Sequence, residues 1–218
     1  MKLRSVILFA AIVVPASAAQ ADAGVGARVG TMGIGGDVGF DVAPTLSARV
    51  GYSAFSWARH EHSSDVSYKS KLKLSNFSGL LDWSPAPTPF RLTGGLVFGD
   101  NKYTVQSEGG TFTTNGHTYN SNDASLSGAV KPGRRLAPYL GAGYGNVSGK
   151  GVNFYFDLGV IFHGSPKATI NASCGAALSA AACAQLQSDA ADESRRLEDK
   201  LSKYKYYPVA NIGITVGF

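Results

Sequence analysis

The sequence predicts an all-β protein, an eight-stranded antiparallel transmembrane β-barrel with a helix in its last extracellular loop. Three features predict this class: an N-terminal export signal, a period-two alternation of apolar and polar residues, and a final residue, Phe218, that ends an alternating segment. With 44% hydrophobic and only 16% charged residues among 218, the chain is too apolar to be disordered. Its 27 glycines have no three-residue period, which excludes collagen, and no apolar run is long enough for a helical membrane bundle.

Residues 1–21 have the pattern of a secretory signal peptide. Lys2 and Arg4 precede a short apolar stretch at 6–14, and Ala19-Gln20-Ala21 fits the A-x-A cleavage pattern. The stretch is too short to cross a bilayer, which takes about 20 residues, so an N-terminal anchor is the weaker alternative. Loss of Lys2 and Arg4 lowers the formal net charge of +5 by two. The remaining excess has no basic run with stacking aromatics, so we expect no nucleic-acid partner.

The mature chain, 22–218, is predicted to be one outer-membrane β-barrel. In 152–163 and in 207–218, bulky apolar residues on one face oppose small and polar residues on the other. A barrel would turn the apolar face to lipid, whereas a secreted β-sandwich, the alternative fold, would bury it. Aromatic residues at strand ends favour the barrel, because they match interfacial girdles. These aromatic residues are Phe40, Phe77, Trp83, Phe90, Phe98 and Tyr144.

Eight alternating segments are predicted to form the strands. They lie near 24–31, 34–42, 46–57, 71–83, 90–99, 125–144, 152–163 and 207–218. Short turns with Pro or Gly at 43–45, 84–89 and 146–151 would lie in the periplasm, and an even strand number places both termini there. The sixth strand, 125–144, is interrupted by Pro132-Gly133, which could instead mark a loop boundary.

Two long segments are predicted to be extracellular loops. Residues 100–124 are rich in Gly, Asn, Thr and Ser, while 165–205 contains a helical pattern at 184–204. We expect an exposed loop helix with a solvated charged face, and a lid over the barrel mouth is the alternative. Cys174 and Cys183 are predicted to form a local disulfide in the oxidising exterior, since no further metal ligands lie near them.

The same alternation predicts which charges face the barrel interior. Three positive and three negative side chains share the inward face, and they should pair, because an unpaired buried charge is costly. These lumen-facing residues are Arg28, Asp37, Arg49, Asp82, Arg91 and Asp157. One interpretation is a solid ion-paired core without a pore; the other is a polar path for small zwitterionic solutes. Most strand glycines also face inward, where they would make room for Arg and Tyr side chains.

No catalytic or metal site is predicted. A lipid-modifying enzyme would need a His with a Ser or Asp near the membrane surface, and no motif joins His163 to such a partner. His60-Glu61-His62 lacks the HExxH spacing of zinc helices and is interpreted as solvated loop. We therefore expect a protein that is not an enzyme and uses no cofactor.

Several short segments, in order along the chain, carry a resemblance to a known family. They are VGTMGIGG from Val29, ARVGY from Ala48, APYLG from Ala137, GSPK from Gly164 and YYPV from Tyr206. Through them the sequence resembles the carbapenem-resistance-associated (CarO-like) outer-membrane proteins of Gram-negative bacteria, and its architecture resembles the OmpW-like barrels. The resemblance implies an eight-stranded barrel without a wide channel and uptake of small solutes such as basic amino acids. Residues 100–124 and the Cys174–Cys183 segment depart from the family pattern.

The sequence thus predicts a porin-like transport protein of the bacterial outer membrane, a narrow or gated conduit for small polar, amino-acid-like solutes. The alternative is a structural or adhesive surface barrel without transport. Expected partners are outer-membrane lipids and lipopolysaccharide, the barrel-assembly machinery and the transported solutes. Phe218 is expected to serve as the C-terminal assembly signal.

Overall fold

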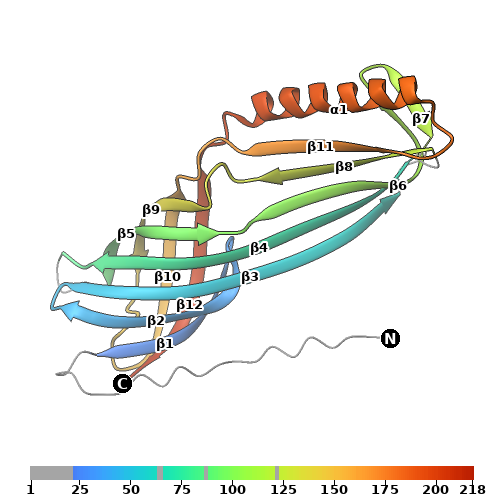
Figure 1. The fold of residues 1–218 in the computed structure, drawn as a ribbon. Coiled ribbons are helices and arrows are strands. Elements are labelled where there is room, and N and C mark those ends of the chain that lie inside the picture. Colours follow the sequence, from blue (N-terminus) through green and yellow to red (C-terminus); the bar gives the residue numbers. More distant parts are fainter. Residues whose placement is uncertain (1–21, 63–65, 86–87, 121–122) are drawn as a thin grey trace, which may run out of the picture.

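The computed structural model describes residues 22–62, 66–85, 88–120 and 123–218, which form twelve strands and one helix (Figure 1). The predicted signal peptide, 1–21, lies outside these residues. The elements are β1 (Ala23–Gly30), β2 (Gly33–Ala43), β3 (Leu46–His62), β4 (Val66–Trp83), β5 (Phe90–Gly99), β6 (Lys102–Thr114), β7 (His117–Asn120), β8 (Ala124–Lys131), β9 (Leu136–Tyr144), β10 (Gly151–Ile161), β11 (Lys167–Cys174), α1 (Ala180–Leu201) and β12 (Tyr207–Gly217).

Eight of the strands pair in a closed antiparallel ring. The order is β1-β2-β3-β4-β5-β9-β10-β12, and β12 pairs with β1 to complete the cycle. Closure leaves no free strand edge within the ring, as a membrane barrel requires. Both ends of the described chain meet at one rim, where Ala23 and Phe218 exchange two backbone hydrogen bonds. The described residues of the turns, 43–45, 84–85, 88–89 and 145–150, lie at that rim, which we call the turn end.

At the opposite end, the sheet continues as a long extension beyond the ring. β3 and β4 run on together in unbroken register from Leu46–Trp83 to His62–Ser67. β6, β8 and β11 then add to β4 in that order, which makes a five-stranded antiparallel sheet (Figure 1). We call β6, β7, β8, β11, α1 and the far halves of β3 and β4 the extension.

Helix α1 covers the free edge of the extension at β11. The backbone N–H of Ala168 donates to Glu198 Oε1 at 3.1 Å, and that of Ile170 donates to Ser194 Oγ at 2.7 Å. These side chains take the place of a further strand and so satisfy an edge that would otherwise be open to aggregation. Leu186 of α1 is fully buried against Phe112 and Ala124, which closes a small apolar core at the far end of the sheet.

A buried carboxylate joins α1 to the hairpin of β6 and β7. Asp189 accepts hydrogen bonds from Asn115 Nδ2 at 3.1 Å and Gln185 Nε2 at 2.9 Å, and its other oxygen lies 3.0 Å from His117 Nδ1. The hydrogen bond from Asn115 is the largest cause that lowers the pKa of Asp189, with Gln185 and His117 adding to it. Asn115 and Gly116 both have positive φ, the conformation of an Asn-Gly hairpin turn.

Three predicted segments differ from the structure. The predicted sixth strand, 125–144, is two strands: β9 belongs to the ring, while β8 belongs to the extension, and Pro132-Gly133 separates them. The predicted loop 100–124 is largely β6 and β7, and the loop 165–205 contains β11 as well as the helix. Both were misassigned because their polar residues alternate weakly, and strand pairing with distant segments overrides that local signal.

The helix also differs from its prediction. It spans Ala180–Leu201 rather than 184–204, and Ser179 caps its start by accepting from the backbone N–H of Ala182. Its charged face is solvated as predicted, with Arg195 and Arg196 exposed, but the helix packs along β11 and β6 and is not a lid on the ring. His60 lies in β3, not in a loop.

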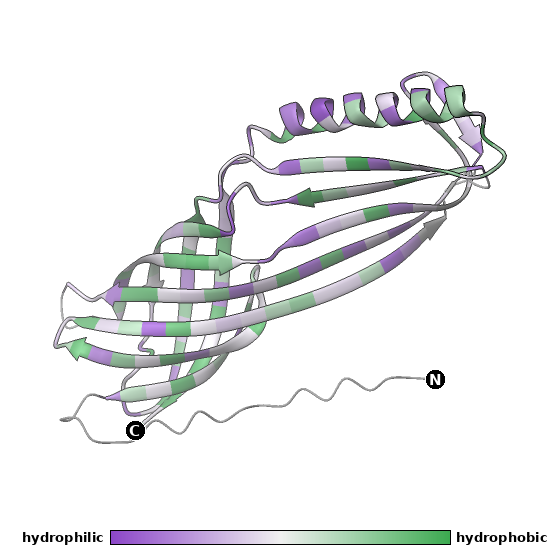
Figure 2. Cartoon of the chain, in the orientation of Figure 1, coloured by the Kyte–Doolittle hydropathy of each residue, from purple (hydrophilic) through white to green (hydrophobic). Residues whose placement is uncertain are grey.

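The outer surface of the ring is apolar. Outward residues of the ring strands alternate with interior ones, as the striping in Figure 2 indicates. Many large outward side chains are at least 40% exposed; examples are Val38, Leu81, Leu96, Leu140, Phe154 and Ile212. The six aromatic residues predicted to lie at strand ends are exposed as well, although Phe77 lies inside β4: Phe40, Phe77, Trp83, Phe90, Phe98 and Tyr144. Among the described residues no helix is long and apolar enough to cross a membrane.

Cys174 and Cys183 form a disulfide between the end of β11 and the first turn of α1, with Cα atoms 5.8 Å apart. We predict that the Cys174→Ser/Cys183→Ser variant loosens the extension and leaves the ring intact. The bridge closes only a short loop, so its loss acts on local opening of α1 from β11. Limited proteolysis should cut the variant within 175–205 at least several times faster than the wild type, while the heat-modified gel shift of the barrel is unchanged. Equal cleavage rates would contradict this role.

Candidate functional site: the barrel interior

The six charged residues predicted to face inward all lie inside the ring and are buried to 4% exposure or less. They come from six different strands of the ring, β1, β2, β3, β4, β5 and β10. The residues are Arg28, Asp37, Arg49, Asp82, Arg91 and Asp157. Their charges sum to zero, so these side chains make the interior polar without giving it a net charge.

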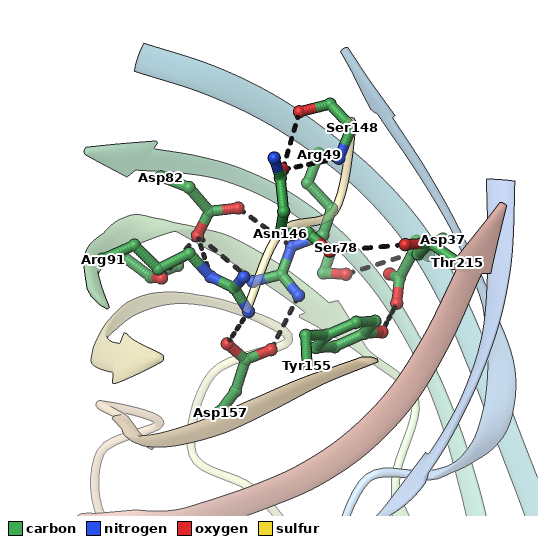
Figure 3. A network of polar contacts seen from close by, with 12 residues as sticks. Asp37, Arg49, Ser78, Asp82, Arg91, Asn146, Ser148, Tyr155, Asp157 and Thr215 are labelled. Carbon is green, nitrogen blue, oxygen red and sulfur yellow. Dashed lines mark hydrogen bonds and ion pairs between the residues drawn. The ribbon is translucent and has the colours of Figure 1, made fainter. Parts of the chain in front are cut away.

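Four of these side chains form one continuous ring of ion pairs (Figure 3). Arg49 Nη1 lies 2.7 Å from Asp157 Oδ2, and its Nε lies 3.2 Å from Asp82 Oδ2. Arg91 contacts the same two carboxylates, with Nη2 at 2.6 Å from Asp157 Oδ1 and Nε at 3.4 Å from Asp82 Oδ1. Each guanidinium therefore lies between two carboxylates and each carboxylate between two guanidiniums, and we call this group the Arg–Asp ring.

The remaining charges make a second pair beside the Arg–Asp ring. Arg28 Nη1 lies 2.8 Å from Asp37 Oδ1, and its Nη2 donates to Ser78 Oγ at 3.2 Å. Tyr155 connects the two groups. Its hydroxyl donates to Asp37, and its aromatic side chain packs against both arginines of the Arg–Asp ring (Figure 3). The guanidinium carbons of Arg49 and Arg91 lie 5.4 and 5.3 Å from the Tyr155 ring centroid, within cation–π range.

Inward glycines provide the space for these side chains. A Cβ on Gly213 would lie 2.3 Å from the Tyr155 ring, and one on Gly143 would lie 2.4 Å from Asp157 Oδ1. Gly79 and Gly94, which face outward, would meet nothing within 4 Å. The interior is thus too full to admit even a methyl group at its glycines, which is a property of close packing.

Above the Arg–Asp ring, toward the extension, an apolar cluster fills the interior. Met32, from the tight turn between β1 and β2, is folded inward to 3% exposure, and its carbonyl accepts from Ser53 Oγ and Asn76 Nδ2, each at 3.1 Å. The buried members of the cluster are Met32, Leu80, Val97, Ala137, Tyr139, Ile161 and Val209.

At the turn end, the segment 146–149 folds into the ring. Val147 and Ser148 are each 1% exposed, and a Cβ on Gly24 would lie 2.4 Å from the Val147 carbonyl oxygen. Ser148 Oγ donates to Asp41 Oδ1 at 2.5 Å, and Thr215 Oγ1 donates to the Asn146 carbonyl at 3.3 Å. We call 146–149 the turn plug, because with the apolar cluster it closes the Arg–Asp ring in from both ends.

The turn plug and Tyr155 were not among the predicted site residues. A turn at 146–151 was expected, but only as a periplasmic connection. The sequence feature that could have indicated the turn plug is a group of inward glycines at one end of the ring. Gly24, Gly39 and Gly217 all lie against the backbone of the turn plug. The sequence feature that could have indicated Tyr155 is that it is the one aromatic residue among the inward positions of β10.

The other residues singled out from sequence lie away from the Arg–Asp ring. His163 follows β10 at the extension end and is buried, and Phe218 lies at the turn end with 74% of its surface exposed. In the part of the chain that the structure describes, no three His, Cys, Asp or Glu side chains are placed to hold a metal ion.

No family model and no curated protein matches the sequence. The solved structures that match the fold include Acinetobacter baumannii CarO2, with 21% identity and a TM-score of 0.59, covering 91% of this chain and 100% of that one. They also include A. baumannii CarO, with 20% identity and a TM-score of 0.57, covering 89% of this chain and 97% of that one. The chain has a CarO-like fold.

We predict that Asp82→Ala and Asp157→Ala each destabilise the CarO-like barrel by about 3–5 kcal/mol, because each leaves two buried guanidiniums sharing one carboxylate. The matched control is Asp100→Ala, which removes the ion pair between Asp100 and Arg135. The Asp100 side chain is 47% exposed. That surface pair should contribute about 1 kcal/mol or less. Urea unfolding in detergent, followed by the heat-modified gel shift, gives the three values. Equal midpoints for all three variants would contradict the buried ion-pair assignment.

Proposed function

We propose that this CarO-like protein is an outer-membrane barrel that acts as a gated conduit for small polar, amino-acid-like solutes. The observation that carries the proposal is the nature of the interior, which is filled by charge-balanced polar side chains and by a turn. A barrel that served only as an anchor would need no such polar interior, since apolar side chains pack a core at lower desolvation cost.

The apolar outer surface supports placement in the outer membrane. Contiguous exposed apolar patches of more than a few hundred Å² are rare on soluble proteins, whereas the ring carries exposed Val, Leu, Ile and Phe side chains around its circumference. Exposed aromatic side chains at the strand ends suit the two membrane interfaces. Neutral pairing of the inward charges allows them to lie at the depth of the membrane.

A solute would have to pass three layers, of which the turn plug and one member of the apolar cluster, Met32, belong to turns rather than to the barrel wall. The turn plug is held by the hydrogen bonds of Ser148 and Thr215, and Met32 of the apolar cluster lies on the turn between β1 and β2. Withdrawal of the turn plug would expose a rim lined by Gly24, Gly39 and Gly217. The amino and carboxylate groups of a zwitterion would then replace contacts within the Arg–Asp ring one for one.

A second candidate function is a surface platform, in which the ring only anchors the extension. The extension favours it, because its parts are tied together well: a disulfide, an edge covered by α1, and the buried Asp189. Such a platform would act by contact with other cells or with the envelope, and the lumen would stay closed.

Loosening the turn plug distinguishes the two functions. We predict that Ser148→Ala/Thr215→Ala raises the rate of glycine and ornithine uptake into proteoliposomes, and the open time in planar bilayers, by about thirtyfold, since two hydrogen bonds of about 1 kcal/mol each are lost from the closed state. The matched control is Thr45→Ala/Thr88→Ala, which removes two exposed hydroxyls from the other turns at the same end. Its uptake should equal that of the wild type.

Absence of uptake and conductance in both the wild type and the loosened variant would overturn the conduit and favour the platform. Membrane placement is tested separately, by fractionation of cells that express the full chain. Recovery of the protein in the soluble fraction would overturn that part of the proposal.

A further inference from the structure

One face of the extension is rich in lysine. In β4, Lys69, Lys71 and Lys73 occupy alternate positions, so they share a face of the strand. Lys71 and Lys73 are exposed. The opposite face of the same stretch carries Leu72 and Leu74, so the extension presents an apolar face and a cationic face.

The lysines also align across the strands. Lys73 of β4 pairs with Lys102 of β6, and Lys131 of β8 pairs with Lys167 of β11. The pairing of Tyr103 with Val130 places the next positions, Lys102 and Lys131, side by side. Four adjacent strands therefore contribute one lysine each to a single row across the sheet, which we call the lysine row: Lys73, Lys102, Lys131 and Lys167.

The lysine row costs stability as it stands. Like charges directly opposite each other on paired strands are destabilising, and this row has three such neighbours in succession. The one carboxylate that the described ion pairs place beside it is Asp100, which lies 3.9 Å from Lys73 Nζ and already pairs with Arg135 at 2.7 Å. A row of this kind is stabilised when an anionic partner supplies the missing negative charge.

The position of the row indicates which anion it meets. Lys73 lies on the same face of β4 as Phe77, which belongs to an outward aromatic row with Tyr52 and Phe98. Four residues of strand separate Lys73 from Phe77, about 13 Å along the strand. Because β3 and β4 continue without a register shift, the cationic face is the direct continuation of the apolar outer surface of the ring.

We propose that the lysine row binds the phosphate groups of a phosphorylated glycolipid in the outer leaflet, whose acyl chains lie against the apolar surface of the ring. This inference rests on the outer-membrane placement proposed above, but not on transport through the lumen. Lysine ammonium groups bind phosphate as compact point charges, and several in a row match a headgroup that carries more than one phosphate. Soluble anions would meet the same charges without the anchorage that the neighbouring apolar surface gives.

The test uses the full chain in neutral detergent with diphosphorylated lipid A, and with lipid A from which both phosphates have been removed. Native mass spectrometry gives the dissociation constants. We expect Lys73→Gln/Lys102→Gln/Lys131→Gln to weaken binding of diphosphorylated lipid A by about a hundredfold, since each lysine near an anionic lipid surface contributes roughly a factor of five. The matched control, Lys200→Gln/Lys203→Gln/Lys205→Gln, removes the same charge from exposed positions in and after α1. It should bind as the wild type does.

Further arms distinguish lipid binding from misfolding and from binding of any soluble anion. Lys73→Arg/Lys102→Arg/Lys131→Arg should retain binding within a few-fold, and the glutamine variant should melt at a higher temperature than the wild type without lipid, because the repulsion is gone. Inorganic phosphate at the same phosphate concentration should not displace the lipid. Equal binding of both forms of lipid A by the wild type, or undiminished binding by the glutamine variant, would overturn the proposal. Lack of solute uptake would leave it standing.

Discussion

The arrangement of this protein depends on the Arg–Asp ring, in which two guanidiniums and two carboxylates are held at 2.6 to 3.4 Å in the middle of a closed barrel. Ions removed from water are tolerated only when their partners are fixed, so the surrounding residues are constrained in turn. Inward glycines leave the volume that the long side chains need. Tyr155 covers both arginines and reaches the second ion pair through Asp37, which makes the charged layer one connected unit.

The same protein separates two kinds of chemistry by position. Inside the ring every charge has a partner, and the layer is enclosed by the turn plug on one side and the apolar cluster around Met32 on the other. In the extension the cationic face carries a row of lysines with little carboxylate beside it. The charge-balanced interior suits zwitterions that can exchange with existing ion pairs, whereas the lysine row suits a polyanion at the surface. The two proposals share the outer-membrane placement but concern different surfaces, so transport through the lumen and lipid binding by the lysine row can succeed or fail independently of each other.

Period-two alternation predicted the ring strands and their inward charges, because facing in a strand follows directly from residue parity. It did not predict the extension, since β8 pairs with β11 and β6 through contacts that no local pattern reports. The Asn115-Gly116 turn was a usable hairpin signal in 100–124, and the break at Pro132-Gly133 correctly marked where the chain leaves one sheet region for another. The sequence alone could not predict that the turn plug folds into the ring, because it does not show which glycines lie together at that end.

Coupling within the Arg–Asp ring is tested most directly by a double-mutant cycle between Arg49 and Asp157, whose closest atoms are 2.7 Å apart. The free energies of unfolding of Arg49→Met, Asp157→Leu and the double variant would be measured in urea against the wild type. Since Arg91 and Asp82 still pair in the double variant, the two losses should be strongly non-additive, with a coupling of about 2 kcal/mol or more. Additive losses, with a coupling near zero, would contradict the account.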